Sequence, residues 1–182
     1  MATINGVSGD DTLTGGAGSD TINSGAGSDT IDGGAGSDKL NAGSGNDTLI
    51  YKMSDAMAGD VDIYTGGSGV DTIQVEMTYA NWVAYKSQFD AYQTHLATYT
   101  NAKTGEVSNG LASDFTFKFI NPDGVSTLTV QMVEKLVVDT AYIRYAAVTT
   151  LKLGDDAAAL YHRGDSLRWL RRFPERSEEH TS

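Results

Sequence analysis

The chain contains no cysteine and no long apolar run among its 182 residues. Disulfide bonds and thiolate metal sites are therefore excluded, and cysteine usage says nothing about the redox compartment. No apolar stretch approaches the roughly 18 residues of a membrane-spanning helix, so we expect no membrane span. Residues 1–5 show neither the basic start nor the apolar core of a Sec signal peptide.

Positive charge is scarce in the first segment of the chain. Residues 1–75 hold 16 of the 21 glycines and eleven acidic residues against two lysines, a formal charge of −9 out of −11. Clustered negative charge attracts cations and argues against nucleic acid or an anionic membrane as a partner. We therefore divide the chain into a first domain, residues 1–75, and a second, residues 76–150.

A nine-residue period organises the first domain. Five units run without a gap over residues 6–50, and after the interruption YKMSDA two more cover residues 57–74. Position six of every unit is aspartate: Asp11, Asp20, Asp29, Asp38, Asp47, Asp62 and Asp71. Position eight is always apolar: Leu13, Ile22, Ile31, Leu40, Leu49, Tyr64 and Ile73.

This spacing predicts short strands joined by glycine turns. One apolar residue per unit, pointing inward from a strand, can stack into a narrow core, so we assign positions seven to nine to strand. Glycines at positions one, two and four permit left-handed turns in which a side chain would clash. A flexible Gly/Ser/Asp linker and a metal-free β-helix are the alternatives, but a linker has no reason to keep this period.

The units resemble the repeats-in-toxin (RTX, hemolysin-type) calcium-binding family, whose nonapeptide is G-G-x-G-x-D-x-U-x. The resemblance implies a parallel β-roll in which two units form one coil, so that turns on the same side are two units apart in the sequence. Glycine turns with one aspartate each supply the mixed carboxylate and carbonyl oxygens that calcium prefers. The implied ligands are the seven aspartates and the position-four glycines Gly18, Gly27, Gly36 and Gly45.

The same geometry predicts which aspartates face each other. Three pairs, and hence three calcium sites, lie within the uninterrupted units: Asp11 with Asp29, Asp20 with Asp38, and Asp29 with Asp47. If the interruption bulges out without breaking the coil, Asp38 with Asp62 and Asp47 with Asp71 raise the number to five. Because such rows of like charge repel one another, we expect residues 6–74 to be disordered without calcium and to fold with it.

The second domain has the pattern of one amphipathic helix and a few strands. Six apolar residues share one helical face over residues 79–99: Trp82, Tyr85, Phe89, Tyr92, Leu96 and Tyr99. Thr78 is a candidate N-cap. The spacing also suits a coiled-coil seam, but few charges flank it, which favours packing on the domain's own sheet. Residues 115–120 and 126–139 alternate as strands around a turn at 121–124. We expect a mostly β fold: a β-roll followed by a small α+β segment, which would cap its open end.

No catalytic constellation accompanies these elements. His95, His162 and His180 lack zinc-ligand spacing, and neither a nucleophile elbow nor a phosphate-binding loop is present. We therefore expect a non-enzymatic structural module of a secreted, extracellular or cell-surface bacterial protein. The alternative is a calcium-binding accessory domain of a secreted hydrolase whose catalytic part is missing.

The end of the chain differs in composition. Five of the six arginines follow residue 162, and residues 163–166 spell the adhesion tetrapeptide RGDS, which is short enough to arise by chance. We leave residues 151–175 as an uncertain tail and interpret residues 176–182 as a translated sequencing adapter. Proteins with such repeats are typically exported by type I secretion through a C-terminal signal, which this chain would then have lost. The loose resemblance of residues 52–74 and 134–137 to stretches of large adhesin-like proteins suggests an adhesin as the parent protein, with no macromolecular partner identified.

Overall fold

A computed structural model describes residues 1–107 and 113–140 of the chain. These residues belong to one compact unit, Met1–Ile143. The expectations for residues 151–175 and 176–182, the RGDS tetrapeptide, His162 and His180 lie outside the described residues.

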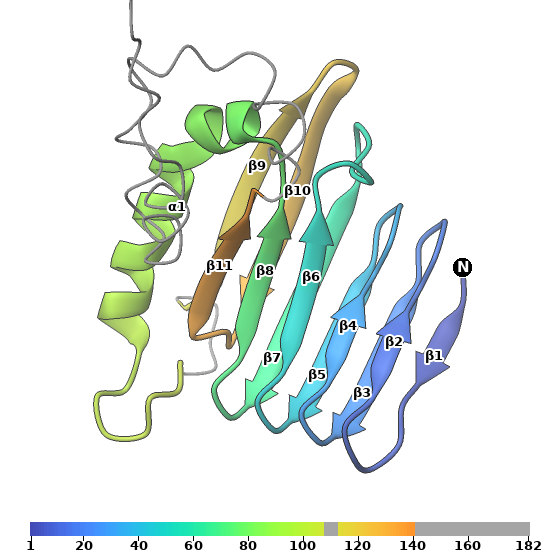
Figure 1. Ribbon diagram of the computed structural model, residues 1–182, viewed down its shortest axis with the longest axis vertical. Helices are drawn as coiled ribbons and strands as arrows, with labels where there is room; N and C mark the ends of the chain where they lie inside the picture. Colours follow the sequence, from blue (N-terminus) through green and yellow to red (C-terminus); the bar gives the residue numbers. More distant parts are fainter. Residues whose placement is uncertain (108–112, 141–182) are drawn as a thin grey trace, which may run out of the picture. The chain divides into compact units, whose positions relative to one another are not determined.

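The strands between Thr3 and Glu76 alternate between two sheets (Figure 1). The first sheet contains β1 (Thr3–Asn5), β3 (Thr21–Ala26), β5 (Lys39–Ser44) and β7 (Val61–Ser68). The second contains β2 (Thr12–Thr14), β4 (Thr30–Asp32), β6 (Thr48–Lys52) and β8 (Thr72–Glu76). Within each sheet, every strand pairs in parallel with the strand one coil further on. The predicted parallel β-roll is confirmed.

A regular coil spans two nonapeptide units, and the interruption lengthens one coil without breaking it. Leu13 pairs with Ile31 at this regular interval. Leu49 pairs with Ile73 at an interval that is longer by the length of the interruption YKMSDA. The first two residues of the interruption, Tyr51 and Lys52, continue β6 and pair with β8. The other four lie among the turns that lead to β7.

Strand length departs from the prediction of three residues per unit. β2 and β4 have three residues, but β3 and β5 have six and β7 has eight. The longer strands run on into the first positions of the next unit, where Gly25 pairs with Gly43 and Gly43 with Gly67. Parallel ladder hydrogen bonds therefore hold part of the segment that the sequence assigned to turn.

The second segment adds one more coil to the roll. β9 (Phe115–Asn121) and β10 (Gly124–Gln131) form the predicted antiparallel hairpin. β10 also pairs in parallel with β7, and β11 (Lys135–Asp139) pairs in parallel with β8. The sequence predicted the hairpin but not this continuation of both sheets.

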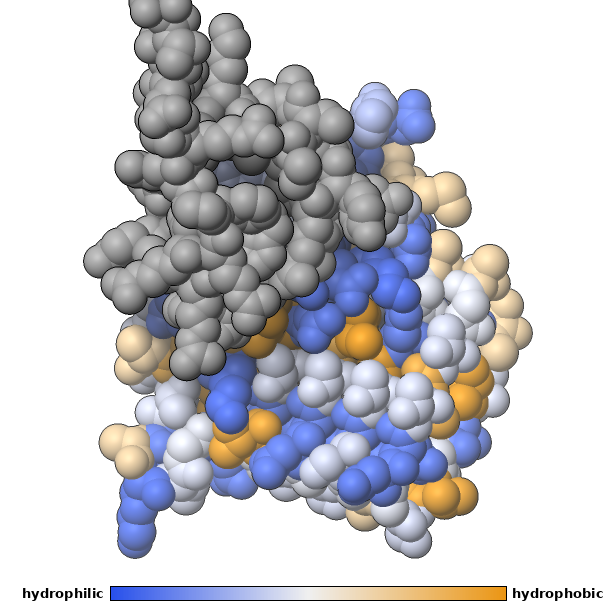
Figure 2. Space-filling view, in the orientation of Figure 1, coloured by the Kyte–Doolittle hydropathy of each residue, from blue (hydrophilic) through white to orange (hydrophobic). Residues whose placement is uncertain are grey.

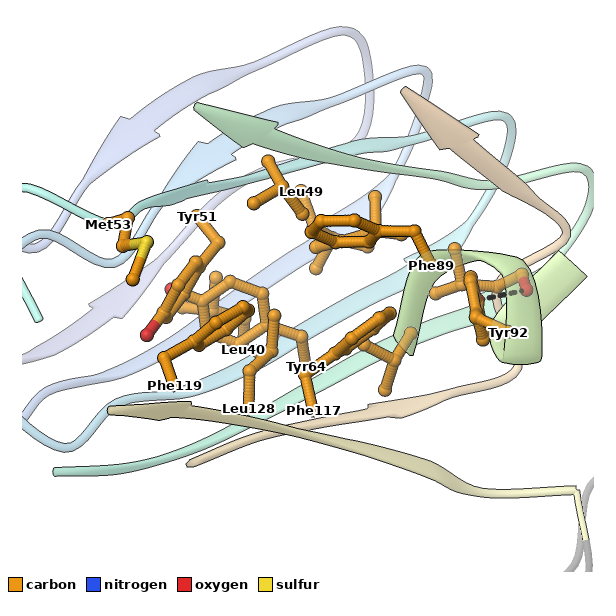
Figure 3. Close-up of a cluster of buried hydrophobic side chains, with 14 of the residues drawn as sticks. Leu40, Leu49, Tyr51, Met53, Tyr64, Phe89, Tyr92, Phe117, Phe119 and Leu128 are labelled. Carbon is orange, nitrogen blue, oxygen red and sulfur yellow. Dashed lines mark hydrogen bonds between the residues drawn. The ribbon is translucent and has the colours of Figure 1, made fainter. Parts of the chain in front are cut away.

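The core is a single stack between the two sheets (Figure 3). Six of the seven position-eight side chains are buried, from Ile22 to Ile73, and Leu13 in the outermost coil is half-buried. Towards the other end the stack becomes aromatic: the Tyr51 ring stacks on Phe119 at a centroid distance of 5.4 Å. Leu128 and Val130 of β10 complete it.

The helix α1 (Tyr79–Tyr99) covers the end of the roll formed by β9, β10 and β11, opposite β1 and β2 (Figure 1). Its buried residues are Tyr85, Phe89, Tyr92 and Leu96, with Trp82 and Tyr99 partly buried beside them. The predicted face and the predicted packing on the chain's own sheet are therefore confirmed. Thr78 caps the helix by accepting a hydrogen bond from the Asn81 N–H at 3.2 Å.

The part of the roll's surface that is visible in Figure 2 is mostly polar. Outward-facing threonines occupy position seven along the second sheet, where Thr12, Thr30, Thr48 and Thr72 are in register. Within the described residues, no helix is long and apolar enough to cross a membrane.

Candidate metal-binding turns

The position-six aspartates form two hydrogen-bonded ladders, one along each row of turns. In each step a backbone N–H donates to the carboxylate one coil further on. The long ladder contains Asp11, Asp29, Asp47, Asp71 and Glu134, with N···O distances of 2.7–2.8 Å. The short ladder runs from the Ala2 N–H through Asp20 and Asp38 to Asp62, with distances of 2.8 Å for its last two steps.

All five predicted aspartate pairs are thus brought together, including the two that span the interruption. Asp38 N donates to Asp62 Oδ1 and Asp47 N to Asp71 Oδ1 across 24 residues. Of the seven predicted aspartates, six are buried and only Asp11 is half-buried.

Burial makes these carboxylates costly to ionise. Desolvation, aided by the charge of neighbouring aspartates, raises the pKa of Asp62 and Asp71 to about 7 and that of Asp38 to about 6. Desolvation likewise raises the pKa of Asp47 and Glu134. In a ladder without cations, burial therefore shifts the protonation equilibrium of these five carboxyl groups towards the neutral form.

Each ladder step onto an aspartate uses Oδ1, so the ladder itself provides no partner for Oδ2. Oδ2 of Asp29, Asp38, Asp47 and Asp71 is buried with no hydrogen-bond partner. Buried polar atoms are normally satisfied, so four orphaned oxygens in equivalent turns call for a missing partner, either a hydrogen-bond donor or a cation.

The available donors can be compared with the preferences of different cations. In the described part of the chain, no three Asp, Glu or His side chains come close enough to hold a metal ion together. Any ion in these turns must therefore take most of its ligands from backbone carbonyls. Calcium accepts six to eight oxygens of this mixed kind, whereas zinc favours nitrogen and sulfur. The residues present fit calcium.

The position-one glycines leave no room for a side chain beside Oδ2. A Cβ on Gly33 would lie 2.6 Å from Asp38 Oδ2, and one on Gly66 would lie 2.5 Å from Asp71 Oδ2. The same Cβ on Gly66 would also overlap the Met132 carbonyl oxygen. At Gly33 and Gly66 the close approach thus requires glycine, whereas Ser24 and Ala42 occupy position one in the units of Asp29 and Asp47. Our prediction that position one adopts a left-handed conformation is wrong, because positive φ occurs at positions two and four instead.

The position-four glycines predicted as ligands lie in the bends between strands. Gly18, Gly27, Gly36 and Gly45 all have φ between 99° and 137°. Adjacent turns also approach too closely for any side chain there, since a Cβ on Gly45 would overlap the Gly27 carbonyl oxygen. These glycines let neighbouring turns stack closely.

Position five provides a second set of contacts, which the sequence did not suggest. Ser28 N donates to Asp10 Oδ1 at 2.7 Å, and Val70 N donates to Asn46 Oδ1 at 2.8 Å. Position five thus accepts from the following coil, whereas position six accepts from the preceding one. Adjacent turns are held in both directions.

Sequence reasoning also missed one repeat at each end. Residues 3–5 (TIN) form β1 in register with residues 21–23, which have the same three letters. Glu134 occupies a position-six site, since Lys135 pairs with Thr72 as Lys39 pairs with Ile63 in the other sheet. The string EKL at 134–136, beside DKL at 38–40, was the available signal.

Comparisons with known proteins agree with this geometry. A family model for the RTX calcium-binding nonapeptide repeat matches residues 3–31 and 14–49, with four copies. The comparisons with curated proteins and with solved structures gave no match. The units over residues 57–74 lie beyond the matched region but continue the same ladders. Residues 3–49 of this chain thus match the RTX calcium-binding nonapeptide repeat, and the coils that follow continue the same β-roll.

Proposed function

We propose that the turns of this roll bind calcium ions and that calcium drives the folding of residues 6–74. The observation that carries the proposal is the set of buried, unpartnered Oδ2 atoms on Asp29, Asp38, Asp47 and Asp71. Leaving one buried polar group unsatisfied costs about 1–3 kcal/mol, and more when the group is charged. Four such groups lower the stability of the metal-free roll considerably, because its core gains only one buried apolar residue per unit.

Repulsion along the ladders adds to this cost. Strands of neighbouring coils are about 4.8 Å apart, and two unit charges at that spacing repel by about 3 kcal/mol at an effective dielectric constant near 20. Ordering the glycines of the turns costs further conformational entropy. A divalent cation between carboxylates turns the repulsion into attraction, so folding and calcium binding are coupled.

The calcium requirement suggests where the protein works. Sites built largely from neutral carbonyl oxygens resemble extracellular modules, whose dissociation constants are about 10⁻⁴–10⁻³ M. Cytosolic calcium is too scarce to fill such sites, so the roll would stay unfolded until export and fold outside the cell. We infer a secreted or cell-surface protein in which the roll is a structural, adhesin-like module.

A non-catalytic role is part of the proposal. His95 lies among aromatic rings, 4.5 Å from the Tyr99 ring centroid and 5.4 Å from that of Phe115. Its Nε2 is 2.7 Å from the Ser113 carbonyl oxygen. These contacts support a packing role for His95.

Calcium titration of the full chain followed by far-ultraviolet circular dichroism tests the proposal. We expect a cooperative gain of β signal with calcium and none with magnesium, which demands a tighter octahedral cage. Asp29→Ala should raise the calcium midpoint strongly, because Asp29 accepts from Asp11 and donates to Asp47. Asp90→Ala on the exposed side of α1 is the control. A spectrum that calcium does not change would overturn the proposal.

A further inference from the structure

The two ends of the long ladder differ from its middle. Oδ2 of Asp29, Asp47 and Asp71 is buried without a partner. The carboxylates at the two ends, Asp11 and Glu134, each receive a backbone N–H on the oxygen that corresponds to this orphan. At the two ends, the protein itself provides a hydrogen-bond donor to the carboxylate oxygen that has no partner in the middle of the ladder.

At the first end the donor is Val7. Its N–H donates to Asp11 Oδ2 at 2.7 Å. Val7 occupies position two of its unit, where Gly16, Gly25, Gly34, Gly43 and Gly67 have φ between 87° and 115°. Met132 is the only non-glycine residue with positive φ in the described ranges, so Val7 does not share the glycine conformation. The first turn therefore directs a main-chain donor at its own aspartate.

At the other end the donor is Val107, from the segment that follows α1. Glu134 Oε2 accepts the Asp71 N–H and Oε1 accepts the Val107 N–H, both at 2.7 Å. Both partners are buried, with Val107 only 5% exposed and Glu134 9% exposed. A cation at Oε1 would have to displace this N–H and leave it buried without an acceptor, which is costly.

The last turn is also too short for the interior geometry. Six residues separate Thr65 from Thr72, which are the partners of Gln131 and Lys135 in the next coil. Only three residues, 132–134, separate Gln131 from Lys135. This turn lacks the glycine loop whose carbonyl oxygens would complete a calcium site. At the first end, the Asp11 turn has a neighbouring turn on one side only among the described residues.

We propose that Asp11 and Glu134 are protein-closed ends of the long ladder and supply no carboxylate ligand to calcium. On this ladder, calcium is held only at the interior turns of Asp29, Asp47 and Asp71. The inference rests on the proposed calcium binding and deepens it, because it states where on the long ladder the ions stop. Asp11 and Glu134 thus have a structural role, although each lies one coil from a proposed ligand in the same ladder.

Three variants that each exchange one carboxylate oxygen for an amide nitrogen test the inference: Asp11→Asn, Asp47→Asn and Glu134→Gln. Isothermal titration calorimetry of the full chain with calcium gives the number of ions bound. Asp11→Asn should bind as many ions as the unmodified chain, with affinity within about twofold. Asp47→Asn should lose at least one ion, or weaken binding by roughly tenfold, about 1.4 kcal/mol.

Glu134→Gln should keep the number of ions but lower the thermal midpoint of the calcium-loaded protein, because an amide cannot accept from both Asp71 N and Val107 N. Circular dichroism in saturating calcium verifies that each variant is folded. If Glu134→Gln does not fold, Asp11→Asn still decides. An ion lost in Asp11→Asn, with binding by the unmodified chain intact, would overturn this inference alone. No calcium bound by the unmodified chain would overturn the proposed function as well.

Discussion

The backbone N–H of Asp47 donates to Oδ1 of Asp71 at 2.8 Å across 24 residues, in the same geometry that links Asp29 to Asp47 across 18. The extra six residues are absorbed at one edge of the roll, where Tyr51 and Lys52 lengthen β6. The ladder therefore depends on the stacking of turns and not on a constant sequence interval. Carboxylates of neighbouring turns therefore remain adjacent on both sides of the interruption.

Asp38→Asn should weaken calcium binding by roughly tenfold or more, since a buried oxygen ligand is replaced by a hydrogen-bond donor. Asp10→Asn is the matched control, because Asp10 also accepts an N–H from the next coil but is exposed. Calcium titration calorimetry measures both. Equal effects of the two substitutions would show that the buried Oδ2 of Asp38 is not a ligand.

Gly34→Ala should destabilise the calcium-loaded roll by about 3 kcal/mol or more, through strain and overpacking together. Its Cβ would overlap the Gly16 carbonyl oxygen, at a φ of +87°. Gly16→Ala has a φ of +105° but meets nothing within 4 Å, so only the backbone strain of about 1–2 kcal/mol applies. Urea unfolding in saturating calcium compares the two, and a larger loss for Gly16→Ala would contradict the packing argument.

As the pH rises, metal-free stability should fall, whereas the stabilisation that calcium adds should grow. Because the folded-state pKa of Asp62 and Asp71 is raised to about 7 from 3.8, the contribution of these groups to metal-free stability is fully present below about pH 4. It is lost as the pH rises through 7. Calcium must displace the protons, so its affinity should rise over the same interval.

Thermal unfolding in metal-free buffer and in excess calcium, at pH 5 and pH 8, measures both trends. The metal-free protein should retain more ordered structure at pH 5, and the gain in midpoint from calcium should be larger at pH 8. A gain from calcium that is equal at the two pH values would mean that the buried aspartates do not bind the ion.

Phe89→Ala on α1 should cost about 3–5 kcal/mol, as expected for a large buried aromatic side chain. Phe89 is 4% exposed, and its ring centroid lies 5.5 Å from that of Phe117 in β9. Val83→Ala, at a helix position that is 53% exposed, should change stability by less than about 0.5 kcal/mol. Chemical denaturation in saturating calcium gives both losses of stability. Similar losses would argue against the packing of α1 on the end of the roll.

Much of the fold and most of the candidate site could be predicted from the order of residues. The nonapeptide period, together with the coil that the resemblance to RTX repeats implies, placed Asp29 and Asp47 one coil apart. The spacing from Trp82 to Tyr99 located the buried face of α1, because helical periodicity is local and depends on few neighbours. The sequence did not identify Glu134 as a member of the ladder, because its unit lacks the glycines that mark the others. Its role is visible only through its contacts with Asp71 and Val107.

By itself, then, the sequence determined the coil, the inward apolar row and the aspartate at each turn, because a repeated local pattern repeats a local geometry. Only the tertiary structure decided which carboxylate oxygens are satisfied and which are left without a partner. Position six looks alike in the units of Asp11 and Asp47, yet the N–H of Val7 reaches one carboxylate and no donor reaches the buried Oδ2 of the other. That difference arises from the conformation of the first turn, where Val7 stands in place of the positive-φ glycine of later units. At Glu134 it arises from Val107, a donor that the segment after α1 brings in and that the sequence period does not encode.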